Sequence, residues 1–331
     1  MNDNPALIVD GLTTEFRTRS GWVTVVDDIS FQVRTGEIVG LVGESGSGKS
    51  VTCLSIMKLL KAGQSRVTAR RILLEGDDIS RFDDRRMRRL RGTKMSMVLQ
   101  DPMSSLNPTL TLGTQVGEAV KRIGSSEQSV RARSIGVLQD VHLSSPEGRL
   151  SQYPHVLSGG MRQRVCIAMA IASRPRILFA DEPTTALDVT IQSQVLELLR
   201  GLRDEYGMAI VLVTHDVGVV AQACDQVAVM YAGRIVESGT VRDVMKSPRH
   251  PYTAGLLASV PTIGERPEFK TMEGQPPDPR FMPRGCRFEP RCSERLLECI
   301  DSYPPFFAVD NEHLFACWRC NTQMPAQVGT Q

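Results

Sequence analysis

The sequence predicts an α/β protein with a largely parallel core sheet. From about Leu7 to Gly239, short β-branched runs alternate with longer stretches that have the period of a helix. Three of the runs are apolar throughout and are interpreted as buried strands, at 38–42, 177–180 and 209–213. Alternation of this kind is typical of a parallel sheet covered by helices.

The segments before and after these runs complete the predicted core. The stretch from Leu7 to Val33 contains strand-like runs and indicates an added antiparallel sheet. A helix is expected from Lys49 to Leu60, directly after the first buried strand. Segments 227–230 and 234–237, joined through Tyr231-Ala232-Gly233, are expected to form a closing hairpin.

The composition changes after Val244, where prolines recur from Pro248 to Pro290. Because proline interrupts helices, this part is expected to be an extended tail without long helices. We therefore place a domain boundary near residue 245, with one domain at 1–245 and a C-terminal extension at 246–331. A chain of 331 residues is longer than a single core usually needs, which agrees with two parts.

Bulk properties narrow the function classes. The formal net charge of +2 disfavours a nucleic-acid binder, which usually shows a strong basic excess. No apolar run approaches the roughly 18 residues that span a bilayer. The residues from Met1 to Pro5 do not resemble the start of a secretory signal. The chain is therefore expected in the cytoplasm unless partners bring it to a membrane.

A phosphate-binding loop lies between the first buried strand and the expected helix. It reads Gly43-Glu44-Ser45-Gly46-Ser47-Gly48-Lys49-Ser50. Its glycines let backbone N–H groups turn toward an anion, and the positive end of the following helix points at the same place. In this pattern Lys49 reaches the β- and γ-phosphates of a nucleotide and the Ser50 hydroxyl binds Mg²⁺. The loop alone predicts a nucleoside triphosphate site.

An acidic pair follows the second buried strand. Asp181 stands at the strand's end, where its carboxylate can hold Mg²⁺ beside Ser50. Glu182 comes next and points in a different direction, as a general base for an attacking water must. On its own such a pair is often only a helix cap, but its spacing of about 130 residues from the loop fits one class of NTPase.

Residues Leu157-Ser158-Gly159-Gly160-Met161-Arg162-Gln163-Arg164 resemble the signature motif of ATP-binding cassette proteins. Ser158, Gly159 and Gly160 open a second helix and so form another anion-binding N-terminus. In that family the motif caps the γ-phosphate bound by a partner cassette. The resemblance implies a cassette fold of the P-loop NTPase class, with a RecA-like core sheet, an antiparallel β subdomain and a helical subdomain that carries the signature.

Other positions match the same family in order along about 240 residues. By this resemblance Phe16 stacks on adenine, with a core aromatic as the plainer alternative, and Gln100 senses the γ-phosphate and Mg²⁺. Ala186-Leu187-Asp188 resembles the loop that couples two active sites across a dimer. His215 resembles the switch histidine that hydrogen-bonds the γ-phosphate. Residues 101–108 resemble the loop that contacts the membrane subunits.

The tail resembles the extension of dipeptide and oligopeptide importer ATPases. The matching stretches are Ser247-Pro248-Arg249-His250-Pro251-Tyr252-Thr253 and Gly285-Cys286-Arg287-Phe288-Glu289-Pro290-Arg291-Cys292. The resemblance implies a subunit on the cytoplasmic face of a bacterial inner membrane. Its partners would be a second ATPase subunit (a different one, or a second copy), two permeases and an extracytoplasmic solute-binding protein. No nucleic-acid partner is expected.

The cargo stays open at this stage, because relatives of the subfamily also carry nickel, glutathione, opines or oligosaccharides. Two rival functions are a soluble cassette ATPase of DNA repair or translation and a regulatory, redox-sensing subunit. Repair versions insert long coiled coils and translation versions usually carry two cassettes, and the sequence has neither feature.

Five of the eight cysteines crowd into the tail, and four of them, Cys286, Cys292, Cys299 and Cys317, are the candidate ligands. Four thiolates can hold a [4Fe–4S] cluster or a structural zinc. Zinc sites usually include a tight pair, and here only Cys317 and Cys320 are spaced that way. The looser spacing favours the cluster, with zinc and unligated thiols as the alternatives.

Overall fold

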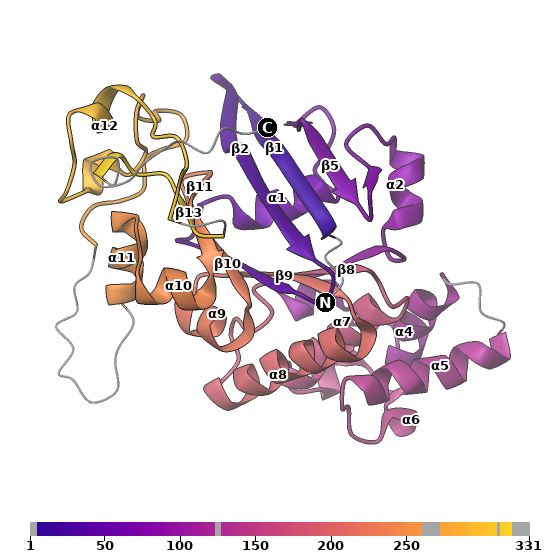
Figure 1. The fold of residues 1–331 in the computed structure, drawn as a ribbon. Coiled ribbons are helices and arrows are strands. Elements are labelled where there is room, and N and C mark those ends of the chain that lie inside the picture. Colours follow the sequence, from indigo (N-terminus) through magenta and orange to yellow (C-terminus); the bar gives the residue numbers. More distant parts are fainter. Residues whose placement is uncertain (1–4, 123–126, 260–271, 310–311, 320–331) are drawn as a thin grey trace. The chain divides into compact units, whose positions relative to one another are not determined.

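The computed structural model describes residues 5–122, 127–259, 272–309 and 312–319 (Figure 1). The chain divides into two compact units, and each is described by itself. The first contains 1–7, 33–38 and 74–213, and the second contains 8–32, 39–73 and 214–331. The predicted boundary near residue 245 lies within the second unit and stays a prediction.

The first unit is built on three parallel strands. Strands β7 (Met95–Val98), β8 (Ile177–Asp181) and β9 (Ala209–Thr214) run side by side, with β8 between the other two. Strands β8 and β9 are fully buried, which explains their uniformly apolar sequences. The two buried strands predicted here are confirmed, each one residue longer than expected.

Helices make up most of the rest of the first unit. Helices α4, α5, α6 and α7 lie together in Figure 1. Helix α4 packs on both α5 and α7. The bounds of the helices and the remaining short strand are α2 (Asp84–Leu90), α3 (Pro102–Ser105), α4 (Leu112–Lys121), α5 (Glu127–Asp140), α6 (Pro146–Arg149), α7 (Gly159–Ile171), α8 (Val189–Tyr206), the 3₁₀ helix η1 (Pro154–Val156) and β6 (Asp77–Asp78).

The second unit holds the predicted β-rich N-terminal part. Strand β1 (Pro5–Thr18) lies between β2 (Gly21–Arg34) and β5 (Arg71–Leu74), and β4 (Ser65–Thr68) pairs with it antiparallel. The first residues of β1, 5–7, and the last residues of β2, 33–34, belong to the first unit. The expected strands before the phosphate loop are thus confirmed.

A second sheet in this unit carries the phosphate loop. Strand β3 (Ile38–Val42) runs parallel to β10 (Gln226–Tyr231), which forms the predicted hairpin with β11 (Arg234–Thr240). Two-residue strands β12 (Phe307–Ala308) and β13 (Leu314–Phe315) extend the sheet beyond β11. The tail therefore adds strands to the core sheet, which its proline-rich sequence did not predict.

Helix α1 (Lys49–Ile56) is four residues shorter than the expected Lys49–Leu60. It ends because Lys58 takes a left-handed backbone conformation with φ of 50°, and no glycine announces this stop in the sequence. Before the tail the unit also has α9 (Val217–Ala223) and α10 (Val241–Lys246). The helices in the described part of the tail are short, as the prolines predicted: α11 (Pro251–Ala258), η2 (Glu289–Arg291) and α12 (Glu298–Asp301).

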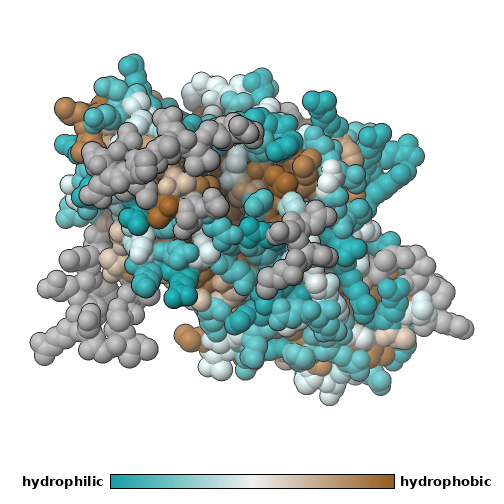
Figure 2. Space-filling model, viewed as in Figure 1, coloured by the Kyte–Doolittle hydropathy of each residue, from teal (hydrophilic) through white to brown (hydrophobic). Residues whose placement is uncertain are grey.

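The tail packs into one hydrophobic core with the β10–β11 hairpin. Tyr231, Tyr252 and Phe288 form its centre, with ring centroids 4.6 to 5.5 Å apart. Hydrophobic side chains also reach the surface over α12 (Figure 2), where Leu297 is 81% and Ile300 49% exposed. Among the described helices, none combines the length and apolar character needed to cross a bilayer.

Candidate functional site

The phosphate loop has the backbone shape that its glycines predicted. Gly43, Gly46 and Gly48 have φ of 158°, 79° and 101°. A Cβ at Gly43 would lie 2.1 Å from the Met230 carbonyl oxygen, so no side chain fits there. Helix α1 begins at Lys49, directly after Gly48. The loop thus delivers backbone N–H groups and a helix N-terminus to one place, as a phosphate group requires.

Lys49 lies folded over the loop. Its Nζ donates hydrogen bonds to the carbonyl oxygens of Gly43, at 2.7 Å, and Glu44, at 2.9 Å. A third contact at 3.4 Å reaches Ser47 Oγ. Lys49 as a whole is only 5% exposed, and its ammonium group stays within reach of the loop. This position fits the predicted role of Lys49 in binding phosphates. Ser50 follows it in the first turn of α1.

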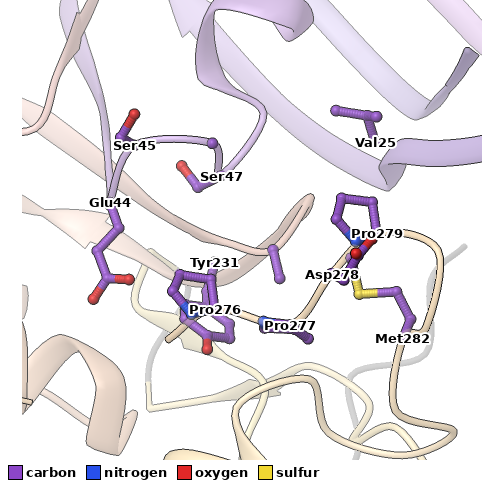
Figure 3. Close-up of a pocket in the computed structure, with 12 residues that line it drawn as sticks. Val25, Glu44, Ser45, Ser47, Tyr231, Pro276, Pro277, Asp278, Pro279 and Met282 are labelled. Atoms are coloured by element: carbon purple, nitrogen blue, oxygen red, sulfur yellow. The ribbon is translucent and has the colours of Figure 1, made fainter. Parts of the chain in front are cut away.

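A cavity of about 410 Å³ opens against the phosphate loop (Figure 3). One side is formed by Ser45, Gly46 and Ser47, and the opposite side by the tail segment 276–279. Val25 and Ala232 also line it. The structure does not place Phe16 in the lining: Phe16 lies on β1 opposite Ser65 of β4 and is half-buried. Its predicted contact with adenine stays a prediction.

The acidic pair lies in the first unit. Asp181 is the last residue of β8 and is 5% exposed. Glu182 has a left-handed backbone with φ of 45°, which is costly for a residue with a side chain. Its N–H donates to the Val213 carbonyl oxygen of β9 at 2.9 Å, which holds it in this conformation.

Gln100 and Thr185 hold the Glu182 carboxylate. Gln100 Nε2 donates to Glu182 Oε2 at 2.9 Å, and the Thr185 hydroxyl donates to the same oxygen at 2.8 Å. The sequence predicted Gln100 and Glu182 as site residues, and the fold brings them together from positions 82 residues apart. Thr185 was missed, because no motif marks it as a partner of Glu182.

The signature residues open helix α7 as predicted. The Ser158 hydroxyl oxygen caps this helix by accepting a hydrogen bond from the Met161 N–H at 3.4 Å. A Cβ at Gly160 would lie 2.6 Å from Cγ2 of Ile191 on α8, so the glycine permits a close approach of two helices. Gly159 lies beside Leu187, where a Cβ would make an ordinary contact at 3.5 Å.

Asp188 caps α8, since its Oδ1 accepts the Ile191 N–H at 2.9 Å. The predicted coupling loop and the signature therefore lie side by side within the first unit. His215 follows β9 and is exposed, in the second unit. Beside it, Asp216 caps α9 by accepting the Gly218 N–H at 2.7 Å. The roles expected for Asp188 and His215 stay predictions.

The residues predicted for Mg²⁺ have suitable chemistry. Ser50, Gln100 and Asp181 offer hydroxyl, amide and carboxylate oxygens, which are the ligands that Mg²⁺ prefers. Asp181 is a buried carboxylate at the carboxyl end of a core strand.

The four candidate ligands Cys286, Cys292, Cys299 and Cys317 line one small space of about 10 Å³, so the fold gathers residues from four parts of the tail. That space is about the size of one water probe. In the described parts of the chain, no group of three or more histidine, cysteine or acidic side chains is arranged to hold a metal ion. The expected cluster and zinc site therefore find no support in the described residues, and Cys320 lies outside them. In the metal-free protein, burial raises the pKa of the Cys286 and Cys292 thiols to about 11.

Comparison with known proteins supports the cassette interpretation. The family model described as ABC transporter matches residues 26–185, and the model of the oligopeptide/dipeptide transporter C-terminal region matches 236–299. A putative peptide import ATP-binding protein of Brucella abortus (strain 2308) is 47% identical over 332 residues, covering 96% of this chain and 98% of that protein. The dipeptide transport ATP-binding protein DppD of Bacillus subtilis (strain 168) is 48% identical over 314 residues, covering 94% of each.

Solved structures agree with these relatives. A dimeric, post-hydrolysis structure of the ATP-binding cassette MJ0796, bound to ADP and phosphate, has a TM-score of 0.62 and 27% identity. It covers 71% of this chain and 99% of that one. CbiO1 of Clostridium perfringens, part of an ABC transporter complex, has the same TM-score at 26% identity, over 74% and 92% of the two chains. The chain therefore belongs to the ATP-binding cassette transporter family and carries the C-terminal region of its oligopeptide/dipeptide transporter branch.

Proposed function

We propose that this chain hydrolyses ATP to energise a bacterial importer of dipeptides or oligopeptides. The observation that carries the proposal is the Glu182 carboxylate, which a strained backbone and two hydrogen bonds hold beside the buried Asp181. Such a fixed carboxylate suits a general base. Family membership supports ATPase activity, and the curated relatives that match nearly the whole chain are described as peptide import or dipeptide transport proteins.

In the proposed reaction, a water molecule attacks the γ-phosphorus of ATP while the bond to the β-phosphate oxygen breaks. Glu182 accepts a proton from this water, and ADP and inorganic phosphate leave. Lys49 and the loop N–H groups bind the phosphates, and Gln100 orients Glu182. Ser50, Gln100 and Asp181 would hold Mg²⁺, which would supply positive charge that offsets the charge on the phosphates.

The proposed partners and location follow from the family. Two cassettes would close over two nucleotides, each site joining the Lys49 loop of one subunit to the Ser158 signature of the other. The complex would contain a second ATPase subunit, two permeases and an extracytoplasmic solute-binding protein, with this chain at the cytoplasmic face of the inner membrane. Metal binding by the tail cysteines is not part of the proposed mechanism. The [4Fe–4S] cluster remains a prediction that rests on the spacing of these cysteines alone.

Replacing the proposed base tests the chemistry. The Glu182→Gln variant removes the proton acceptor but keeps a side chain that can hydrogen-bond Gln100 and Thr185. We expect ATP binding within about twofold of the parent and hydrolysis reduced by at least about 100-fold. Phosphate release and ATP affinity are measured on the assembled transporter, together with uptake of a labelled dipeptide.

Glu197→Gln is the matched control, because Glu197 lies on the exposed face of α8. It should leave hydrolysis and uptake unchanged. Near-normal hydrolysis by Glu182→Gln would remove Glu182 as the base. ATPase activity that no dipeptide or oligopeptide uptake accompanies would contradict the proposed cargo class.

A further inference from the structure

The phosphate loop contains a carboxylate where it binds a polyanion. Glu44 is the second residue of the loop, and an uncompensated negative charge there would repel the phosphates of ATP. The structure shows two tail residues holding Glu44 by its backbone and by its side chain. Figure 3 shows the Glu44 and Ser45 side chains pointing to opposite sides of the loop.

Arg291 forms a two-bond ion pair with this carboxylate. Its Nη1 lies 2.9 Å from Glu44 Oε2 and its Nη2 lies 3.1 Å from Oε1. The Arg291 side chain is only 6% exposed and the Glu44 side chain 24% exposed. An arginine fork on a carboxylate in a sheltered place is both directional and stronger than a surface ion pair.

Arg291 is itself fixed by the tail core. Its guanidinium lies 5.7 Å from the ring centre of Tyr231 and 5.9 Å from that of Phe288. Its Nη1 also donates to the Tyr231 hydroxyl at 3.3 Å. The buried Tyr252 completes the arrangement, because its hydroxyl accepts the Glu44 backbone N–H at 2.9 Å. The loop residue is therefore attached to a rigid aromatic cluster.

The same arginine holds the tail segment across the cavity. Arg291 Nε donates to the Glu273 carbonyl oxygen at 3.0 Å, three residues before Pro276. Gly274, with φ of 80°, passes so close to Arg291 that an added Cβ would lie 3.3 Å from its Cγ. Prolines 276, 277 and 279 then line the cavity opposite Ser45–Ser47. One side chain thus connects both sides of the space beside the phosphate loop.

We propose that Arg291, in the C-terminal extension, is a positioning residue of the nucleotide site. It neutralises Glu44, keeps that carboxylate away from the bound phosphates, and sets the distance between the loop and the proline segment. The extension is thereby part of the ATP-binding apparatus of this chain. This inference rests on the ATP site of the proposed function and adds a residue to it.

A double-mutant cycle on the full-length chain tests the proposal. Binding of the non-hydrolysable analogue AMP-PNP with Mg²⁺ is measured by calorimetry. Arg291→Gln should weaken binding about tenfold, because it leaves Glu44 charged and unpaired. Glu44→Gln should change affinity by less than about threefold. The double variant, with two neutral amides facing each other, should return to within about threefold of the parent.

The controls separate this role from a purely structural one. Arg295→Gln removes a neighbouring arginine that is 63% exposed and pairs with Glu289, and it should leave binding unchanged. Arg291→Lys keeps the charge but loses the fork, and it should give an intermediate loss. Thermal unfolding of each variant is recorded alongside, since a structural staple alone would lower the melting temperature without changing affinity for AMP-PNP.

The outcomes are distinct. Parent-like binding by Arg291→Gln overturns the inference, and so does a double variant as weak as Arg291→Gln alone. Failure of the parent chain to bind AMP-PNP would instead overturn the proposed ATP site itself. Lys49→Ala removes the loop ammonium and should abolish AMP-PNP binding, whether or not Arg291 and Glu44 are also replaced. It therefore shows the result expected when the ATP site itself is lost.

Discussion

At the scale of single residues, the proposed base Glu182 is distinguished less by being a glutamate than by the contacts that hold it in place. Glu182 is kept at φ of 45° by its N–H bond to Val213, and its carboxylate accepts bonds from Gln100 and Thr185. Backbone strain of about 1–3 kcal/mol is maintained only where the surroundings fix it. Together these contacts leave the carboxylate with little freedom to rotate away from its productive direction.

Thr185 is therefore expected to act as a positioning residue. Thr185→Val keeps the shape of the side chain but removes the hydrogen bond to Glu182 Oε2. We expect the turnover number to fall about three- to tenfold with little change in KM for ATP, because the lost bond orients the base and does not touch the nucleotide. Steady-state ATPase assays measure both constants.

Two further variants serve as controls for this prediction. Thr185→Ser restores a hydroxyl and should recover most of the turnover. Thr190→Val makes the same change on the exposed first turn of α8 and should have no effect. An equal loss in Thr185→Val and Thr190→Val would show that the hydrogen bond to Glu182 is irrelevant.

At the scale of helices and strands, the signature depends on a close approach between α7 and α8. Gly160 stands where a Cβ would lie 2.6 Å from Cγ2 of Ile191, and isoleucine is too stiff at this position to swing aside easily. The Asp188 cap fixes the start of α8 through the Ile191 N–H. Any side chain at Gly160 must therefore push the two helix starts apart.

Gly160→Ala should destabilise the chain by about 1–3 kcal/mol, the usual result of overpacking. Gly159→Ala is the matched control, since its Cβ would meet Leu187 at an ordinary 3.5 Å. Ile191→Ala removes the clashing methyl group, so adding it to Gly160→Ala should cost less than the sum of the single changes. Urea unfolding of the parent and the four variants measures these differences, and strict additivity of Gly160→Ala and Ile191→Ala would contradict the explanation.

Much of the element order could be predicted because periodicity and loop motifs are local. The buried strands β3, β8 and β9, the hairpin and the helix after the phosphate loop all have uniform or periodic sequences. The early end of α1 depends on the left-handed backbone of Lys58. The pairing of β13 with β11 depends on a contact of only two residues in each strand. Neither leaves a pattern that can be read along the chain.

The residues of the candidate site divide in the same way, into those that belong to a local motif and those that matter only through a long-range contact. Residues that belong to contiguous motifs, such as Lys49, Ser158 and Glu182, can be proposed from sequence, and their roles stay predictions. Arg291 could not, because its importance comes from a contact with Glu44 that joins positions 247 residues apart. Only the folded chain brings an arginine of a proline-rich tail to a glycine-rich loop.

At the scale of the whole molecule, the tail is joined to the core sheet by a buried carboxylate. Glu237 of β11 is fully buried, and it accepts hydrogen bonds from the N–H groups of Arg249 and His250 at 2.7 and 2.9 Å. His313 Nε2 lies 2.7 Å from Glu237 Oε1. One side chain thus anchors the tail at two places that are far apart in sequence.

His250 makes this attachment sensitive to pH. It is buried, and its Nδ1 accepts the Tyr252 N–H at 3.1 Å, which requires an unprotonated nitrogen. Burial lowers the pKa of His250 from 6.5 to about 4, although the nearby Glu237 carboxylate opposes this shift. Between these two values the unfolded chain binds a proton that the folded chain does not, so the free energy of unfolding falls as the pH is lowered from 6.5.

The loss should reach about 2 kcal/mol by pH 5 and about 3 kcal/mol by pH 4, and then level off. Urea unfolding at pH 7 and pH 5 measures it. In His250→Asn, an amide oxygen can accept the Tyr252 N–H at any pH, so the contribution of this residue should vanish. The difference between the two proteins in this loss measures the contribution of His250. If the parent and His250→Asn lose the same stability between pH 7 and pH 5, the buried histidine does not control the attachment of the tail.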